Sequence, residues 1–372
     1  MKFSCLKTNI NPVIQMASKI VGSRPTLPVL NNVLLKTDKG GVLISSTNLE
    51  LSVSAFVGAK VEIEGGITVP AKLLAEFINS IPDEKISLEL KDSRLEVTGT
   101  NYSAAFNTID MDEFPEPPAM KGEDKVLIPV SVLRDTIQQV ALAAATDEAR
   151  PVITGVLMVI DGKNFTLAAA DGYRLAEQKV VLAEDSTKSN LRLIVPARGL
   201  HELHRLLSDA GDKDFVEVSF DENQALFKYK DIQLTSRLLA GQFPDYQQII
   251  PKKFASVISV DRTELAQAVK TAAIFAKDSA SVIFLSADPA KKTLELKAST
   301  SQVGENNIAV AAEITGPGGT IAFNARYVSD MLSVCSSRKI DLKINDALSP
   351  GVLTPQSDLG SAYTYVIMPI RT

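Results

Sequence analysis

The sequence holds few residues whose types and spacing could support catalysis. Its two histidines, His201 and His204, stand three residues apart, which places both near one face of a helix and could bind a metal ion. No third ligand group stands nearby in a recognisable motif, so we expect a pair that faces solvent or phosphate, and no metal. A catalytic aspartate in Asp171-Gly172-Tyr173-Arg174 would need a base, a nucleophile or a metal partner, and the sequence offers none. A glycine turn between two strands is the simpler interpretation.

Motifs that carry phosphate or acyl-transfer chemistry are absent from the sequence. It has no Gly-Lys-Ser/Thr phosphate loop, no Gly-x-Gly-x-x-Gly after a strand and no Gly-x-Ser-x-Gly elbow. We therefore expect a protein without catalytic residues and without a cofactor. An enzyme built on this chain is the alternative, and a turnover screen with nucleotide substrates would distinguish the two.

Composition limits the class of protein and its compartment. A length of 372 residues, with 45% hydrophobic and 22% charged residues, is typical of a globular chain of two or three domains. The sequence has neither a run of about eighteen apolar residues nor a secretory signal, so we expect no membrane span and no export. Cys5 and Cys335 lie in apolar contexts outside any metal-ligand spacing, which predicts small core residues in a reducing cytoplasm. The net charge of −5 argues against nucleic-acid binding by the whole surface.

Internal similarity divides the chain into three repeats. Val69–Leu74 (VPAKLL) recurs as Val195–Leu200 (VPARGL) after 126 residues, and more weakly as Phe323–Val328 (FNARYV) after a further 128. A second marker, Glu113–Glu116 (EFPE), recurs as Gln242–Asp245 (QFPD) after 129 residues. Two markers with nearly the same period indicate a real repeat.

Each repeat shows the same order of expected elements. A short strand comes first, an amphipathic helix follows, paired strands come next, a second helix starts at the marker, and two more strands close the unit. Pro70 and Pro196 stand just before the second helix, as helix starts favour. The pattern predicts an α+β fold of three similar domains (1–120, 121–250 and 251–372), each with two helices packed on antiparallel sheets. The expected N-caps of the first helices are Asn9 or Asn11, Ser131 and Asp261.

Charge is unequal between the expected helices and the remaining chain. The six helical segments (7–24, 72–81, 131–150, 197–209, 261–277 and 325–339) carry a net charge of +5, so the remainder carries −10. A basic helical layer on an otherwise acidic protein could accept duplex DNA on that layer alone. Ordinary scatter of solvated charges is the alternative.

Four segments resemble those of a known family, the beta subunits of bacterial DNA polymerase III, or sliding clamps. They are Gly22–Leu30 (GSRPTLPVL), Ala170–Ala176 (ADGYRLA), Phe243–Tyr246 (FPDY) and Tyr365–Arg371 (YVIMPIR). The resemblance covers the whole chain, with the segments in the right order and at the right spacing.

The resemblance implies a fold, an assembly and a set of partners. Two protomers, each supplying three similar domains, would form a head-to-tail homodimer that closes as a ring around duplex DNA, with the helices on its inner wall. The implied partners are the polymerase III catalytic subunit, the clamp loader, and repair and translesion polymerases, bound through short motifs of the type Gln-x-x-Leu-Phe. A peptide-binding scaffold that does not encircle DNA is the alternative.

The resemblance also implies three sets of site residues. The ring interface would join Leu73, Phe77 and Phe106 of one protomer to Ile274 and Phe275 of the other. The DNA contacts would be Arg24, Arg198 and Arg205, helped by Lys19, Lys72 and Lys270.

The third set is a pocket for partner peptides between the second and third repeats. Its apolar floor would be Ile153, Leu175, Pro244, Ile249, Val366 and Met368, and its polar rim Arg174, Asn324, Tyr327 and Arg371. Gly172, beside Tyr173 in the same loop, would let a peptide backbone approach closely. Alternation along the last strand predicts that it is half exposed, with Tyr365 and Ile367 facing away from Val366 and Met368.

Overall fold

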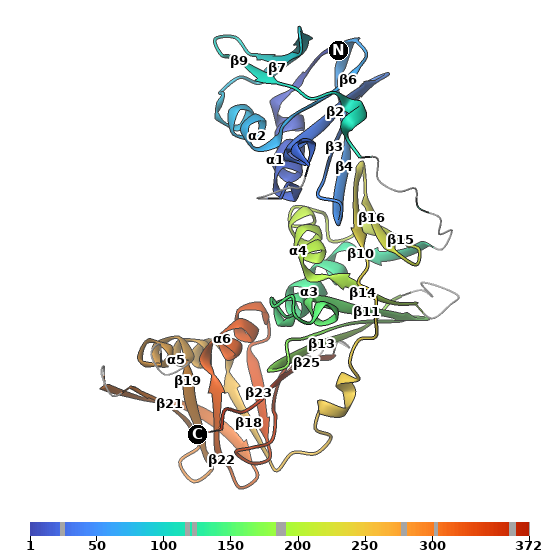
Figure 1. Cartoon of the computed structure of the whole chain (residues 1–372). Helices are drawn as coiled ribbons and strands as arrows, with labels where there is room; N and C mark the ends of the chain where they lie inside the picture. Colours follow the sequence, from blue (N-terminus) through green and yellow to red (C-terminus); the bar gives the residue numbers. More distant parts are fainter. Residues whose placement is uncertain are drawn as a thin grey trace. The chain divides into compact units, whose positions relative to one another are not determined.

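The structure, a computed structural model, describes residues 1–22, 27–115, 120, 125–183, 191–276, 281–300, 304–356 and 362–371. Its contacts divide the chain into two compact units (Figure 1). Unit 1 comprises Met1–Val130 and Asp209–Leu238, and unit 2 comprises Ser131–Ser208 and Leu239–Thr372. The second repeat contributes strands to both units, so the unit boundary does not follow the repeats.

The first repeat lies entirely in unit 1 and has the element order expected from the sequence. Its helices are α1 (Lys7–Ile20) and α2 (Ala71–Ser80), and its 3-10 turns are Pro28–Asn31 and Met111–Glu113. Its strands are β1 (Lys2–Leu6), β2 (Asn32–Asp38), β3 (Gly41–Thr47), β4 (Leu51–Gly58), β5 (Lys60–Ile63), β6 (Gly66–Pro70), β7 (Lys85–Lys91), β8 (Arg94–Thr98) and β9 (Ser103–Asn107).

The second repeat follows the same order, with helices α3 (Val130–Val140) and α4 (Ala197–Leu206). Its 3-10 turns are η3 (Ala141–Ala143) and η4 (Pro151–Thr154). Its strands are β10 (Lys125–Pro129), β11 (Gly155–Asp161), β12 (Asn164–Ala170), β13 (Arg174–Val181), β14 (Leu191–Pro196), β15 (Phe215–Phe220), β16 (Gln224–Tyr229) and β17 (Ile232–Arg237).

The third repeat lies in unit 2 and follows the linker turn η5 (Tyr246–Ile249). Its helices are α5 (Arg262–Phe275) and α6 (Ala325–Val334). Its strands are β18 (Ser256–Asp261), β19 (Val282–Asp288), β20 (Thr293–Thr300), β21 (Gly304–Thr315), β22 (Gly319–Asn324), β23 (Lys339–Ile344), β24 (Gly351–Pro355) and β25 (Ala362–Ile367). All three second helices start at the repeated marker, at Ala71, Ala197 and Ala325, as predicted.

The helices bury the apolar faces that their sequence periodicity predicts. In α1 the buried side chains are Ile10, Ile14, Ala17 and Ile20, and α1 packs against α2. In α5 they are Leu265, Ala268, Val269 and Ala272, and α5 packs against α6. Cys5 and Cys335 are free and buried, as expected, and burial raises the pKa of the Cys5 thiol to about 12. No helix in the described ranges is long and apolar enough to cross a membrane.

Two of the three predicted N-caps are wrong. Helix α1 begins at Lys7, directly after β1, so Asn9 and Asn11 lie inside it, and the Lys7 N–H donates to the Glu84 carbonyl at 2.8 Å. Helix α3 likewise begins at Val130, whose N–H donates to the Asp214 carbonyl at 2.9 Å, and Ser131 lies inside the helix. A neighbouring carbonyl therefore replaces the capping side chain. The third cap is confirmed, because the Asp261 carboxylate accepts from the N–H groups of Thr263 and Glu264.

The sheets are antiparallel and continue from one repeat to the next. Unit 1 holds a five-stranded sheet, β5-β1-β7-β8-β9, and an eight-stranded sheet, β10-β15-β16-β17-β4-β3-β2-β6. Unit 2 holds one twelve-stranded sheet, β14-β11-β12-β13-β25-β24-β23-β18-β21-β20-β19-β22. Strand β17 of the second repeat pairs with β4 of the first, and β25 of the third pairs with β13 of the second. Main-chain hydrogen bonds thus join consecutive repeats.

We predict that the junction between β17 and β4 contributes strongly to the stability of unit 1. Leu234 and Val53 lie opposite each other there, each 1% exposed. Leu234→Ala should lower the free energy of unfolding by about 2–5 kcal/mol, because it removes buried apolar surface and leaves a cavity. Urea denaturation measures the loss, with Leu127→Ala as the matched control. Leu127 is 57% exposed, so its truncation should change stability by less than about 0.5 kcal/mol. Equal losses for both variants would contradict the assigned core.

Candidate functional site

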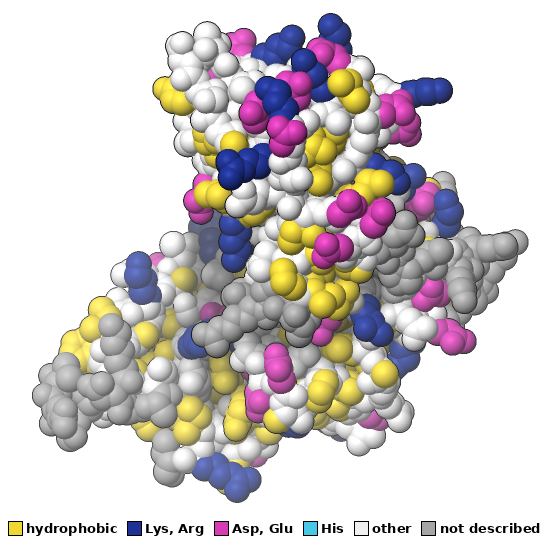
Figure 2. All heavy atoms as spheres, turned by 45° about the horizontal axis from the view of Figure 1, so that its top comes forward, with side chains coloured by type: hydrophobic (Ala, Val, Ile, Leu, Met, Phe, Trp, Pro, Cys, Tyr) yellow, Lys and Arg dark blue, Asp and Glu magenta, His cyan; other side chains and the backbone are white. Residues whose placement is uncertain are grey.

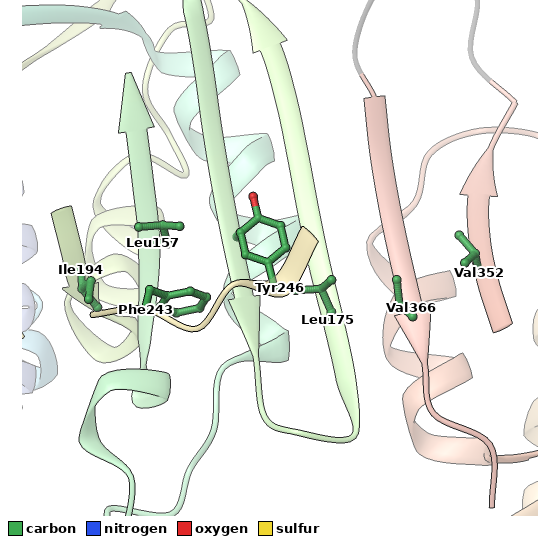
Figure 3. Close-up of a cluster of buried hydrophobic side chains, with 8 residues drawn as sticks. Leu157, Leu175, Ile194, Phe243, Tyr246, Val352 and Val366 are labelled. Carbon is green, nitrogen blue, oxygen red and sulfur yellow. The ribbon is translucent and has the colours of Figure 1, made fainter. Parts of the chain in front are cut away.

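The predicted peptide-pocket residues come from five segments of unit 2, and the two central ones pack together. Leu175 on β13 lies directly opposite Val366 on β25, and they are 2% and 1% exposed. Both belong to one buried cluster that also contains Val352, Phe243 and Tyr246 (Figure 3). The remaining buried members are Leu157, Ala168 and Ile194.

The linker between the second and third repeats covers this cluster. Figure 3 shows the Phe243–Tyr246 segment crossing the strands, with both aromatic rings among the cluster side chains. The two rings meet edge to face, with centroids 6.2 Å apart. The Tyr246 hydroxyl donates to Oε1 of the buried Glu177 at 2.7 Å, and Lys179 pairs with the other carboxylate oxygen at 2.8 Å. Burial, with the neighbouring carboxylate, raises the pKa of Tyr246, so this donor stays protonated.

Exposed apolar side chains of the predicted set accompany the buried cluster. Tyr173 is 63% exposed, Ile249 45% and Met368 40%, and Pro244 is also exposed. Ile153, by contrast, is buried in η4, and Arg371 is exposed near the end of the chain. Contiguous exposed apolar side chains are typical of a contact surface, and a main-chain hydrogen bond holds Met368 beside Tyr173.

The last strand is not half exposed, so the alternation prediction was wrong. Tyr365, Val366 and Ile367 are all buried, and only Met368, just past the end of β25, is exposed. The reason is that both faces of β25 are covered. Val366 packs into the linker cluster, and the hydroxyl of Tyr365 on the opposite face accepts a hydrogen bond from Arg174 at 3.2 Å.

The Asp171–Arg174 segment is a tight turn between β12 and β13. Oδ1 of Asp171 accepts from the N–H groups of Tyr173 and Arg174 at 2.8 and 2.9 Å. Gly172 has φ +94°, a left-handed conformation that favours glycine. A Cβ at position 172 would lie 3.5 Å from the guanidinium of Arg150, an exposed residue that the sequence reasoning did not select. The glycine-turn interpretation is confirmed.

Arg174 lies inside the protein rather than free at a rim. Its side chain is 9% exposed and binds Asp171 at 3.0 Å on its own turn and Asp330 at 2.6 Å on α6. Its guanidinium also covers the Tyr327 ring, 4.6 Å from the centroid. Burial by itself would lower the pKa of Arg174, but Tyr365, Asp330 and Asp171 outweigh that effect and raise the pKa. The network ties the turn of the second repeat to α6 of the third.

Asn324 of the third repeat, like Arg174, has a structural partner within the protein. Its side-chain oxygen accepts from the Arg326 N–H at 2.9 Å and caps α6. The main chain beyond β25 joins both repeats, since the Met368 N–H donates to the Tyr173 carbonyl and the Ile370 N–H to the Ala322 carbonyl.

Sequence reasoning missed the partly buried side chains that pack against the cluster, because no local pattern distinguishes them from ordinary core. They are Val152, Val159, Ala170, Leu239, Ile250 and Phe254.

The predicted DNA contacts lie on four different helices. Lys19 is in the last turn of α1, Lys72 in the first turn of α2, Arg198 in the first turn of α4 and Lys270 on α5, all exposed. Arg205 is exposed on α4 but binds the Glu202 carboxylate at 2.6 Å. Arg24 lies outside the described residues.

With the observed bounds, the helices remain more basic than the rest of the chain. Over α1 to α6, Lys and Arg outnumber Asp and Glu by four, and since the whole chain carries −5, the remainder carries −9. On the face drawn in Figure 2, basic and acidic side chains are interspersed and do not form separate positive and negative patches. The described residues contain no group of three or more His, Cys, Asp or Glu that could hold a metal ion.

The predicted interface residues include exposed apolar side chains on both units. In unit 1, Leu73 on α2 is 55% exposed, and Phe77 meets Phe106 of β9 edge to face, with ring centroids 5.8 Å apart. Phe106 itself is 4% exposed. In unit 2, Ile274 near the end of α5 is 58% exposed and Phe275 is half-buried.

Family models match the chain in three consecutive stretches. The N-terminal domain of the DNA polymerase III beta subunit matches residues 1–118, its central domain 127–245 and its C-terminal domain 247–371. The beta sliding clamp of Synechococcus elongatus is 34% identical over 374 residues, which span 100% of this chain and 99% of that protein. The beta sliding clamp of Bacillus subtilis is 29% identical and covered in full.

Solved structures show the same similarity over the full chain length. The crystal structure of the Bacillus subtilis DNA polymerase sliding clamp has a TM-score of 0.93 at 27% identity, covering 100% of this chain and 99% of that chain. A sliding clamp of Pseudomonas aeruginosa bound to griselimycin has a TM-score of 0.92 at 27% identity, with both chains fully covered.

The Arg174 network generates a stability prediction for unit 2. Arg174→Ala should lower the free energy of unfolding by about 2–4 kcal/mol, because it leaves two carboxylates and a tyrosine hydroxyl without their shared donor. Arg174→Lys should recover only part of the loss, since one ammonium cannot span both carboxylates. The matched control is Arg326→Ala. Arg326 approaches the same Asp330 at 4.0 Å but is 78% exposed, so denaturation should show a change below about 0.5 kcal/mol. Equal effects at both positions would contradict this assignment.

Proposed function

The chain belongs to the beta sliding clamp family, the beta subunits of bacterial DNA polymerase III, and its function is that of a sliding clamp in replication; we propose that two copies close head to tail into a ring around duplex DNA. In this proposal the protein tethers the replicative polymerase and other replication and repair proteins without catalysing a reaction. It works in the bacterial cytoplasm, whose reducing conditions suit its free cysteines.

The observation that carries the ring proposal is a pair of unused strand edges. At each internal repeat boundary, the last strand of one repeat pairs with a strand from the middle of the repeat before it. The two observed pairs are β17 with β4 and β25 with β13. In the described residues, the corresponding last strand of the first repeat, β9, pairs with β8 alone. Within the described part of the chain, residues 304–311 of β21, the corresponding strand of the third repeat, pair with β20 alone. An unpaired edge of each kind on one chain fits a second copy.

The strand register at the internal junctions also predicts the register of the proposed junction between two protomers. Thr98 pairs with Ser103 as Lys228 pairs with Gln233, so Ser103 takes the place of Gln233. Ala170 pairs with Leu175 as Ser299 pairs with Glu305, which places Asn307 where the second repeat has Glu177. At the observed junctions, Gln233 pairs with Ser54 and Thr364 pairs with Glu177. At the proposed junction, Ser103 stands in the place of Gln233 and Asn307 in the place of Glu177. Ser103 of one protomer should therefore lie opposite Asn307 of the other.

Helix positions support the same interface. In the observed junction of unit 2, α6 presents Tyr327, its third residue, to Arg174 of the preceding repeat. Leu73 is the third residue of α2, and its exposed side chain has the matching position at the open junction. Ile274 and Phe275 would complete an apolar contact that excludes water from the paired edges.

We predict that a cysteine pair placed in this register will cross-link two protomers. Ser103→Cys with Asn307→Cys puts two thiols on directly opposed residues, within the reach of a disulfide. Mild oxidation should yield covalent dimers on a non-reducing gel. The matched control, Ser103→Cys with Ala311→Cys, moves one thiol four residues, or roughly 13 Å, along the strand and should stay uncross-linked. Equal cross-linking of both pairs, or none, would reject the register.

A second variant tests the apolar part of the interface. Ile274→Ala with Phe275→Ala should produce folded monomers in gel filtration with light scattering, since about 2–5 kcal/mol of burial is lost. A double variant that stays dimeric at low micromolar concentration would refute the assignment of these two side chains.

For DNA, we propose contacts with phosphates through exposed cations on the helices. Lys19, Lys72, Arg198 and Lys270 present flexible charges, while the chain outside the helices is acidic, so a duplex would be attracted to the helical wall alone. Such contacts carry no sequence information and leave the ring free to slide. Arg24, outside the described residues, and Arg205, already paired with Glu202, complete the proposed set.

For partner proteins, we propose a peptide site on the surface formed by the linker, the Asp171–Arg174 turn and the segment after β25. Its ligands would be the short motifs of the polymerase III catalytic subunit, clamp loader, and repair and translesion polymerases. Burying a Leu and a Phe of a Gln-x-x-Leu-Phe motif gains roughly 3–6 kcal/mol. Ordering the free peptide offsets part of this gain, so micromolar affinity is expected and partners can exchange.

We predict that the exposed apolar side chains contribute to this binding. Met368→Ala and Ile249→Ala should each weaken binding of a fluorescent peptide with that motif about fivefold, equivalent to about 1 kcal/mol of lost contact. Val181→Ala is the control, since Val181 is an exposed apolar residue (65%) at the far end of β13. Anisotropy titrations measure all four proteins. Unchanged affinity in both test variants would show that the site is misplaced.

The alternative of a peptide-binding scaffold without encirclement predicts a different result with DNA. A closed ring needs a loader to reach circular DNA, whereas an open scaffold binds linear and circular duplexes equally well. Unaided binding of linear but not of covalently closed DNA, together with a dimeric mass, would favour the ring.

A further inference from the structure

Helix α4 carries an imidazole in the middle of its exposed basic face. Arg198, His201 and Arg205 are all exposed and stand three and four residues apart, so successive turns of the helix bring them to one side. His204 is half-buried and one turn beyond His201. The stripe Arg198–His201–Arg205 therefore spans about two helical turns, roughly 10 Å.

The permanent positive charge of this stripe is smaller than its composition indicates. Arg205 makes two hydrogen bonds to the Glu202 carboxylate, at 2.8 and 2.6 Å, so much of its charge is already neutralised. Arg198 forms no ion pair with the described residues. The charge that α4 offers to an anion thus depends on Arg198 and on the protonation of the imidazoles.

The neighbours of both histidines favour the neutral imidazole in the free protein. Although the His201 side chain is exposed, partial desolvation by its surroundings lowers its pKa, with His204 and Arg205 acting in the same direction and Glu202 opposing them. Burial also lowers the pKa of His204, assisted by Arg134 of α3 and by Arg205, while Asp135 of α3 opposes. Helix α4 also contacts η3, whose Ala141–Ala143 carry no charge, and strands β11 and β14.

We propose that His201 is a further phosphate-contacting residue of the α4 surface and takes up a proton when duplex DNA binds. The proposal rests on the proposed function, because it requires α4 to face the duplex. A phosphate beside Arg198 would bring negative charge to the imidazole, offset the nearby cations and favour the imidazolium, which donates from both ring nitrogens. The half-buried His204, beside Arg134 and Asp135, would take up less of a proton when DNA binds.

Proton uptake gives DNA binding a pH dependence that lysine and arginine contacts lack. Lysine and arginine keep their charge from pH 6 to pH 8, whereas an imidazole changes charge within that range. Because phosphate contact would raise the histidine pKa, affinity should rise about tenfold between pH 8 and pH 6 at constant ionic strength.

The test is anisotropy titration of a labelled short duplex with the full-length dimer, from pH 6 to pH 8 at fixed salt. His201→Gln should bind as the original protein does at pH 8 but lose most of the gain at pH 6. His201→Lys should bind at pH 8 about as tightly as the original protein at pH 6. His204→Gln, the matched control one turn away, should keep most of the pH response.

Arg198→Gln separates failure of this inference from failure of the proposed function. If Arg198→Gln leaves affinity unchanged at pH 8, α4 does not contact the duplex, and the proposed DNA surface is wrong. If Arg198→Gln weakens binding while His201→Gln retains the full pH response, the DNA surface stands and the role of His201 is overturned. Circular dichroism of each variant at pH 6 and pH 8 confirms that the helix is intact.

Discussion

Main-chain hydrogen bonding across repeat boundaries is the constraint on which the rest of this structure depends. A sheet edge exposes a row of unpaired N–H and C=O groups, and proteins cover such edges with another strand, a charged residue or a proline. Here the edge of β4 is covered by β17 and that of β13 by β25. Neither β9 nor residues 304–311 of β21 carries a proline, and the outward side chains of β9 are Ser103, Ala105 and Asn107. Glu305 is the one charged residue in 304–311 of β21, and β9 has none, so both edges are weakly protected and well suited to pairing between copies.

The same continuity explains why the candidate peptide surface can be both exposed and rigid. Because β13 and β25 belong to one sheet, residues about 190 positions apart in the chain, Leu175 and Val366, lie directly opposite each other. The linker then packs Phe243 and Tyr246 onto that seam, and Arg174 fixes the adjacent turn to α6. A ligand surface built on such a sheet loses little conformational entropy when a peptide binds. In the proposed site, most of the entropic cost of binding would therefore fall on the peptide, and the interaction would stay weak and exchangeable.

Sequence patterns predicted the elements well and the side-chain roles less well. Periodicity located α1 and α5 with their buried faces, and the repeated marker located the starts of α2, α4 and α6, because both signals are local. The caps Asn9, Asn11 and Ser131 failed because distant carbonyls, of Glu84 and Asp214, satisfy the first N–H groups instead. Alternation failed at β25 because burial there is set by the linker and by Arg174, which lie far away in the sequence. For the same reason no pattern could show that the Arg174 guanidinium binds Asp330, 156 residues further along the chain.

A ring that slides must hold DNA topologically while keeping each local contact weak. The charge distribution fits this requirement, since the helices carry only four more basic than acidic residues and the remaining chain repels a polyanion. Intramolecular pairing reduces the available charge further: Glu202 engages Arg205, and Lys7 is bound to the carbonyls of Asn79 and Ile81 at the end of α2. Each paired cation contributes less to phosphate binding, because the duplex must first compete with an existing partner. In the proposed ring, affinity for DNA would be reduced at Arg205 by its contact within the protomer, while closure of the sheets between protomers would supply the persistence that single phosphate contacts lack.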